Sequence, residues 1–123
     1  MKKLFTLFVA LVATTALWAY DFKSGDLYYN ITSNTTVEVT YQYFYSVDNY
    51  SEFTELAIPQ QLIYNGIIYT VTSIGESAFS GCKNLSSITI PNSIVNMGNY
   101  AFNNCSSIFI NSCTVITFKH LLI

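Results

Sequence analysis

Apolar and polar residues alternate along several short stretches of the chain, which is the pattern of a β-strand with one buried face. Two stretches, SSITIP (residues 86–91) and ELAIP (residues 55–59), share the same alternation. Each ends in proline, which has no backbone N–H to donate to a neighbouring strand. The side chains that these strands are predicted to bury are Leu56, Ile58, Ile88 and Ile90.

The region 20–54 alternates as well, and its pattern predicts a β-hairpin. A first strand leads to the turn residues Ser33 and Asn34, and a second strand follows. The apolar members of the two strands are Leu27, Tyr29 and Ile31, then Val37, Val39, Tyr41, Tyr43 and Tyr45. The tyrosines either pack on the neighbouring part of the fold or form an aromatic stripe that binds a glycan or a protein.

One motif occurs twice further along the chain. IGESAFSGCKNL (residues 74–85) and MGNYAFNNCSSI (residues 97–108) align without a gap, at one constant spacing. The matching pairs are Gly75 and Gly98, Ala78 and Ala101, Phe79 and Phe102, and Cys82 and Cys105. A repeat this short cannot bury its apolar face alone, so the copies are expected to stack with the phenylalanines inside. The paired glycines suit either a positive φ or a close approach of two backbones.

The spacing departs from this constant value in two places. ELAIP and SSITIP lie further apart than the two motif copies do, and the extra residues surround Asn65-Gly66, a strong signal for an inserted hairpin. SSIFIN (residues 106–111) resembles the start of SSITIP in an alignment that matches Ile88 with Ile108 and Ile90 with Ile110. This alignment predicts a register slip of three residues after Cys105. The final stretch has no match to the repeat.

Together, the I-G-x-x-A-F-x-x-C and S-I-T-I-P motifs resemble the BspA-like leucine-rich repeat family of bacterial surface and secreted proteins. The resemblance covers about half of the chain. It implies a mainly β fold with short helices, in which parallel strands stack as a right-handed solenoid of about two to three turns. The predicted organisation is a hairpin or capping region at 20–54, repeats at 55–110 and an unmatched tail at 111–123.

The resemblance also implies a non-catalytic module for adhesion or protein binding, with host or bacterial surface proteins as partners. Solenoids bind through a broad strand face, and the alternation predicts two outward-pointing rows on it. These rows are Glu55, Ser87 and Ser107, and Ala57, Thr89 and Phe109. The candidate ligand-facing residues are therefore Tyr41, Tyr43, Tyr45, Ser87, Thr89 and Phe109.

An alternative interpretation is a truncated fragment of a longer repeat protein, with no independent function. It is based on the lost register after Cys105 and on the apolar ending HLLI. An uncapped solenoid exposes an apolar end, which would favour self-association through the C-terminal end.

The start of the chain predicts export. Lys2 and Lys3 precede an apolar run from Leu4 to Ala19 that is short for a membrane span, and this is typical of a signal peptide over residues 1–19. An uncleaved anchor helix is the alternative. Cleavage would leave no stable membrane span, and it would place the protein at the cell surface or outside the cell.

The charge balance excludes one class of partner. The chain carries a formal net charge of −2 and has no arginine, and removal of the two N-terminal lysines makes it more acidic. A nucleic-acid-binding protein needs a basic surface that neutralises phosphates. No nucleic-acid partner is therefore expected.

Candidate catalytic chemistry is weak. Gly-Glu-Ser-Ala at Ser77 resembles the start of the turn that presents a hydrolase serine, but Tyr100 takes this place in the second copy and Phe79 replaces the required second glycine. The one histidine, His120, lies in the unmatched tail. We therefore expect no catalytic residues and no enzyme activity.

No cofactor or metal site is expected either, because no Cys–His cluster has the spacing of zinc ligands. Cys82 and Cys105 occupy one repeat position, and stacked strands would bring them within disulfide reach. They either pair or form a column of two small buried side chains.

Overall fold

The computed structural model describes residues 19–42 and 50–112, and the signal-peptide prediction at 1–19 lies almost entirely outside them. These residues form nine β-strands. The strands are β1 (Phe22–Ser24), β2 (Leu27–Ile31), β3 (Thr36–Thr40), β4 (Glu55–Ala57), β5 (Gln61–Tyr64), β6 (Ile67–Ile74), β7 (Ser87–Ile90), β8 (Asn96–Met97) and β9 (Phe109–Ser112).

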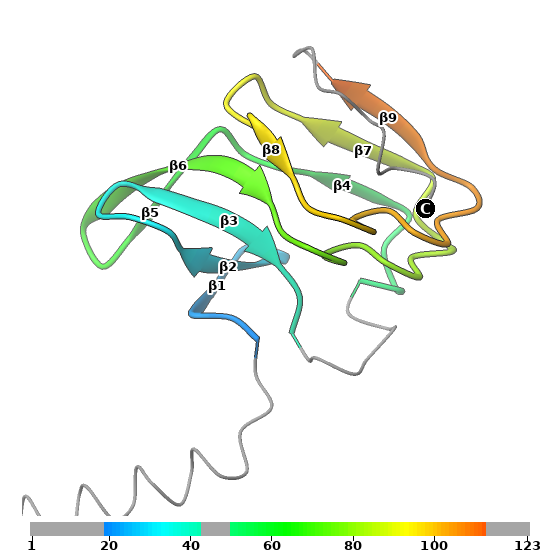
Figure 1. The fold of residues 1–123 in the computed structure, drawn as a ribbon, viewed down its shortest axis with the longest axis horizontal. Helices are drawn as coiled ribbons and strands as arrows, with labels where there is room; N and C mark the ends of the chain where they lie inside the picture. Colours follow the sequence, from blue (N-terminus) through cyan, green and yellow to red (C-terminus); the bar gives the residue numbers. More distant parts are fainter. Residues whose placement is uncertain (1–18, 43–49, 113–123) are drawn as a thin grey trace, which may run out of the picture.

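Two parallel ladders run side by side through the molecule (Figure 1). One ladder contains β4, β7 and β9, and the other contains β3, β6 and β8. Leu56 pairs with Ile88 across β4 and β7, as the alternation predicted. The chain passes from one ladder to the other and back, so it forms three stacked coils.

The first predicted hairpin is present as β2 and β3, which pair antiparallel. β1 extends it, and β3 also lies parallel to β6, so β3 is the first strand of the first coil. Val37 and Val39 are fully buried between the hairpin and the repeats. β2 therefore covers the outer edge of β3 in the first coil, where backbone groups would otherwise be unpaired.

The second predicted hairpin is formed by β5 and β6. Its two turn residues, Asn65 and Gly66, have φ values of 50° and 76°. Two central residues with positive φ match the strand twist in a two-residue hairpin turn, which explains the preference for Asn-Gly. This hairpin is the insertion that lengthens the first repeat spacing.

The predicted short helices are wrong, because the described residues contain no helix. The repeat motif instead forms tight turns in which the N–H groups of one coil donate to carbonyls of the next. The bonds run from Ser77 N to Asn99 O (3.0 Å), from Phe79 N to Ala101 O (2.8 Å) and from Gly81 N to Asn103 O (2.7 Å). A helix would use these N–H groups internally, so contact between coils replaces helix formation.

The glycines of the motif serve close approach and not a positive φ. A β-carbon on Gly98 would lie 2.4 Å from the backbone nitrogen of Glu76, and one on Gly75 would lie 3.0 Å from the Val39 carbonyl oxygen. Positive φ occurs instead at Ser77 and Tyr100, which occupy one repeat position with φ of 58° and 61°. The turn geometry thus repeats even where the residue type does not.

The size of the register slip predicted for the third coil is wrong. Ile88 pairs with Ile110 and not with the expected Ile108, and Ser87 pairs with Phe109. Half-buried Ile108 keeps the place of Leu85, and Phe109 N donates to Ser86 O at 2.8 Å. The slip is one residue because the backbone bonds between coils fix the strand start.

Aromatic rings form a column through the coils. Phe79 and Phe102 are 0% and 3% exposed, and their rings stack with centroids 5.2 Å apart and planes 9° from parallel. Tyr50 continues the column on the other side, with its ring centroid 5.0 Å from that of Phe79. The sequence pattern predicted both phenylalanines and missed Tyr50, because the first coil carries no AF motif.

We expect Tyr50→Phe to lower the free energy of unfolding by about 2 kcal/mol. The buried Tyr50 hydroxyl donates to Thr40 O and accepts from Tyr28 N at 3.0 Å, so its removal leaves two backbone groups unsatisfied. Burial also raises the pKa of this hydroxyl well above its usual range. Urea unfolding measures the change. Tyr100→Phe, at a side chain that is 42% exposed, is the control and should change stability by less than about 0.5 kcal/mol. Equal effects of the two substitutions would contradict this role.

Candidate functional site

The outer face of the β4–β7–β9 ladder is the candidate site. Register places Glu55, Ser87 and Phe109 in one row, and Ala57, Thr89 and Asn111 in the other. Ser107, predicted for the first row, lies in the turn before β9, and Phe109 takes its place. Because the slip is one residue and not the predicted three, Phe109 lies in the Ser87 row and not in the predicted Thr89 row.

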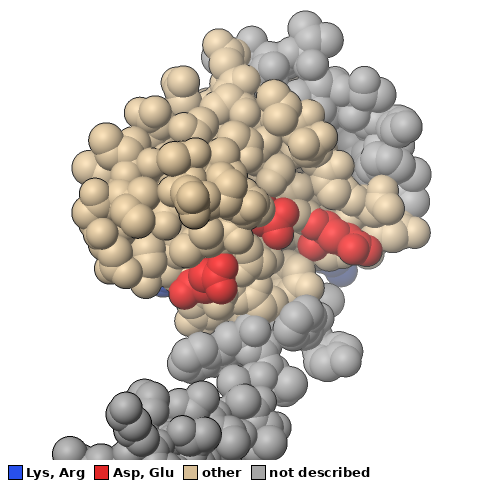
Figure 2. Space-filling view, turned by 60° about the vertical axis from the view of Figure 1, so that its left-hand side comes forward, with Lys and Arg blue, Asp and Glu red and all other residues tan. Residues whose placement is uncertain are grey.

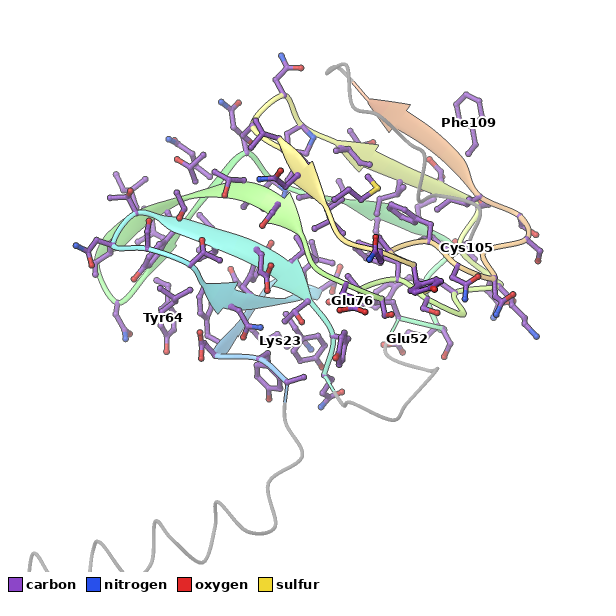
Figure 3. All side chains as sticks on the ribbon, in the orientation of Figure 1. Lys23, Glu52, Tyr64, Glu76, Cys105 and Phe109 are labelled. Atoms are coloured by element: carbon purple, nitrogen blue, oxygen red, sulfur yellow. The ribbon has the colours of Figure 1, made fainter. Side chains whose placement is uncertain are left out.

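The residues of this face differ in accessibility. Ser87 is half-buried, Thr89 is exposed and the Phe109 side chain is 67% exposed. The Phe109 ring points away from the sheet (Figure 3). An exposed aromatic ring beside small polar residues suits contact with another protein, because aromatic side chains are enriched at interfaces.

A groove of about 520 Å³ opens at the β4 side of this face. Its lining residues are Asp26, Glu55, Leu56, Ala57, Ser87 and Thr89. Asp26 belongs to the turn between β1 and β2 and is far from the others in sequence, so no local pattern could have placed it here. The groove combines two exposed carboxylates with two hydroxyl groups.

The tyrosine stripe is only partly described. Tyr41 is half-buried, and burial, together with the nearby charges of Glu76 and Glu38, raises the pKa of its hydroxyl. Tyr43 and Tyr45 lie outside the described residues. Tyr41 therefore belongs to a different surface from that of Ser87, Thr89 and Phe109, because its acidic neighbours come from β3 and from the turn after β6.

Acidic side chains gather along the lower part of the face shown in Figure 2, while basic side chains emerge only at its rim. Within the described residues, no three His, Cys, Asp or Glu side chains converge to hold a metal ion. The same part of the chain contains no helix of the length and apolar character that crossing a membrane requires.

Ser77 lies in an inter-coil turn and not on a strand-to-helix elbow. Its positive φ of 58° is shared by Tyr100 in the next coil, so the backbone conformation belongs to the repeat. Ser77 N also donates to the next coil. These contacts give Ser77 a structural role.

Cys82 and Cys105 are free thiols in adjacent coils, with Cys82 buried and Cys105 half-exposed. The Cys105 thiol donates to Phe79 O at 2.9 Å. A hydrogen bond between the two side chains, together with burial, raises the pKa of Cys82, and the same bond lowers the pKa of Cys105. The arrangement matches a column of two stacked side chains.

We expect iodoacetamide to modify Cys105 faster than Cys82 near neutral pH. The thiolate is the reactive form, and each unit of pKa difference changes its population about tenfold. Peptide mapping after brief alkylation measures both rates, in a Cys113→Ser background that removes the third thiol. Alkylation of Cys105 in urea gives the unfolded reference. Faster modification of Cys82 in the folded protein would contradict the expectation.

Comparisons with known proteins agree with this geometry. The model of the BspA type leucine rich repeat region (6 copies) matches residues 15–107 and 65–119. A leucine-rich repeat protein from Bacteroides ovatus is 32% identical with a TM-score of 0.63, over 84% of this chain and 24% of its own. One from Bacteroides capillosus is 28% identical with a TM-score of 0.61, over 74% of this chain and 64% of its own. No curated protein matches the chain.

A third solved structure, a leucine rich cell surface protein from Faecalibacterium prausnitzii, is 26% identical with a TM-score of 0.61. The match covers 77% of this chain and 26% of that protein. The chain thus spans only about a quarter of the length of two of these relatives.

The stacked coils and the parallel β4–β7–β9 ladder define a leucine-rich repeat protein. The family-model match extends over most of the sequence, so the chain belongs to the BspA-type leucine rich repeat family. Proteins of this family are generally non-catalytic repeat modules of bacteria.

Proposed function

We propose that this protein is an exported, non-catalytic module that binds another protein at the bacterial surface through the outer face of β4, β7 and β9. The observation that carries the proposal is the exposed Phe109 ring beside the polar rows of this face. The name of the Faecalibacterium prausnitzii relative, a leucine rich cell surface protein, supports the location. The signal-like residues 1–19 support export, and the family resemblance favours a right-handed solenoid.

Binding to purified host matrix proteins tests this function. Biolayer interferometry with the folded mature chain is expected to detect at least one partner. Phe109→Asp should weaken that binding about tenfold or more, because it places a charge in the centre of an aromatic contact. Val95→Asp is the matched control, since Val95 is 69% exposed and lies outside the β4–β7–β9 ladder. Absence of any partner, or equal losses for both variants, would overturn the proposal.

Export has its own measurement. The chain expressed in a Bacteroides host should be recovered outside the cytoplasm with an intact mass that corresponds to cleavage after Ala19. Recovery of the uncleaved chain in the cytoplasm would contradict the proposed location.

A further inference from the structure

The free edge of β4 lies at the groove between the β1–β2 turn and the β4–β7 face. Among the described strands, β4 pairs with β7 alone. Ser87 N donates to Thr54 O at 3.2 Å, and Ile58 N donates to Thr89 O at 3.0 Å. Thr54 and Ile58 therefore direct their backbone groups toward β7.

The backbone groups of successive strand residues point to alternate sides. Leu56 therefore also faces β7, while Glu55 and Ala57 direct their N–H and C=O groups away from it. Glu55 and Ala57 are both exposed. These groups form an accessible strand edge, which is a template for pairing with another extended chain.

Charge at the groove indicates the chemistry of such a chain. The Asp26 and Glu55 carboxylates both line it, and no lysine is among its lining residues. Lys23, on the same hairpin as Asp26, lies over the Tyr28 ring with its Nζ 5.3 Å from the centroid. A basic side chain from outside would complement the two acids, whereas an anionic ligand would be repelled.

We propose that the β4 edge binds an extended peptide segment that carries lysine or arginine, and that the segment adds as a strand beside β4. Main-chain hydrogen bonds to Glu55 and Ala57 supply the pairing, and Asp26 and Glu55 select the basic side chain. This inference rests on the proposed protein-binding function and names the class of partner segment. It also gives a role to Asp26, which the repeat pattern does not include.

Fluorescence anisotropy with three synthetic peptides tests the proposal on the folded mature chain. The probes are an alternating Thr–Lys octapeptide, an alternating Thr–Glu octapeptide, and the Thr–Lys peptide with N-methyl groups at every second residue, made in both phases. We expect the wild-type protein to bind the first peptide and not the second. N-methylation in one phase should abolish binding, because it removes the main-chain donors that face β4.

Protein variants locate the site. Asp26→Asn with Glu55→Gln should weaken binding of the Thr–Lys peptide about tenfold. Ala57→Pro should also weaken it about tenfold, because it removes an outward N–H and keeps the bonds to β7. Glu76→Gln, outside the groove, is the control and should bind as the wild type does. Thermal melting confirms that each variant is folded. If Ala57→Pro does not fold, the double variant of Asp26 and Glu55 tests the site.

Two results with the peptides would overturn the inference. One is that the wild-type protein fails to bind the Thr–Lys peptide. The other is that binding survives both phases of N-methylation and the loss of both acids, which would assign it to diffuse charge attraction elsewhere. Binding of a matrix protein that depends on Phe109 but is unaffected by the groove variants would overturn the inference and leave the proposed function in place. If neither the wild-type protein nor any variant binds a matrix protein, the proposed function itself is overturned.

Discussion

Phe79→Ala is expected to lower the free energy of unfolding by about 3–5 kcal/mol, a typical cost for truncating a buried phenylalanine. The Phe79 ring is 0% exposed and lies between the rings of Tyr50 and Phe102. Its removal leaves a cavity between the rings of Tyr50 and Phe102, and tight turns held by bonds between coils cannot collapse to fill it. Because a small domain has a total stability of about 5–15 kcal/mol, the variant will be near the limit of folding.

Urea unfolding followed by tyrosine fluorescence measures this loss. Phe109→Ala removes the same side chain from a position that is 67% exposed, and it should change stability by less than about 0.5 kcal/mol. The comparison separates burial from residue type. A loss below about 1 kcal/mol at Phe79 would show that the aromatic column does not hold the coils together.

Gly98→Ala is expected to lower the free energy of unfolding by about 3 kcal/mol or more, since overpacking against rigid atoms is costly. The added β-carbon would lie 2.4 Å from Glu76 N and 2.7 Å from Glu76 Cα, and both are backbone atoms that cannot rotate away. Gly98 N also donates to Ile74 O at 2.7 Å, so any shift of the backbone weakens that bond between coils. One methyl group is therefore expected to separate the second and third coils.

The equivalent glycine in the preceding coil is the natural control. A β-carbon on Gly75 would approach the Val39 carbonyl oxygen at 3.0 Å, a contact that small adjustments relieve. Gly75→Ala should therefore cost less than Gly98→Ala in the same urea experiment. If Gly75→Ala cost as much or more, close backbone approach would not be the reason for glycine at this repeat position.

Alternation and repeat spacing correctly predicted the elements whose pattern is local. They located β4 and β7, their pairing through Leu56 and Ile88, the Asn65-Gly66 hairpin, and the buried positions of Phe79 and Phe102. Each of these features depends on a short segment of the sequence. Buried and exposed side chains alternate along a strand, and a two-residue turn requires particular residues.

The same reasoning failed where the outcome depends on contacts between distant segments. The turns replace the expected helices because their N–H groups bond to the next coil, and β9 starts one residue from strict register for the same kind of reason. Tyr50 joins the aromatic column without any motif around it.

The sequence by itself therefore determined the repeat, the strand faces and the class of protein. Only the tertiary structure decided which backbone groups bond between coils, and that Asp26 meets Glu55 at the open edge of β4. The physical reason is that burial produces a periodic pattern of apolar residue types in the sequence. Backbone hydrogen bonds and close backbone contacts between coils involve atoms that every residue carries, so they produce almost no such pattern.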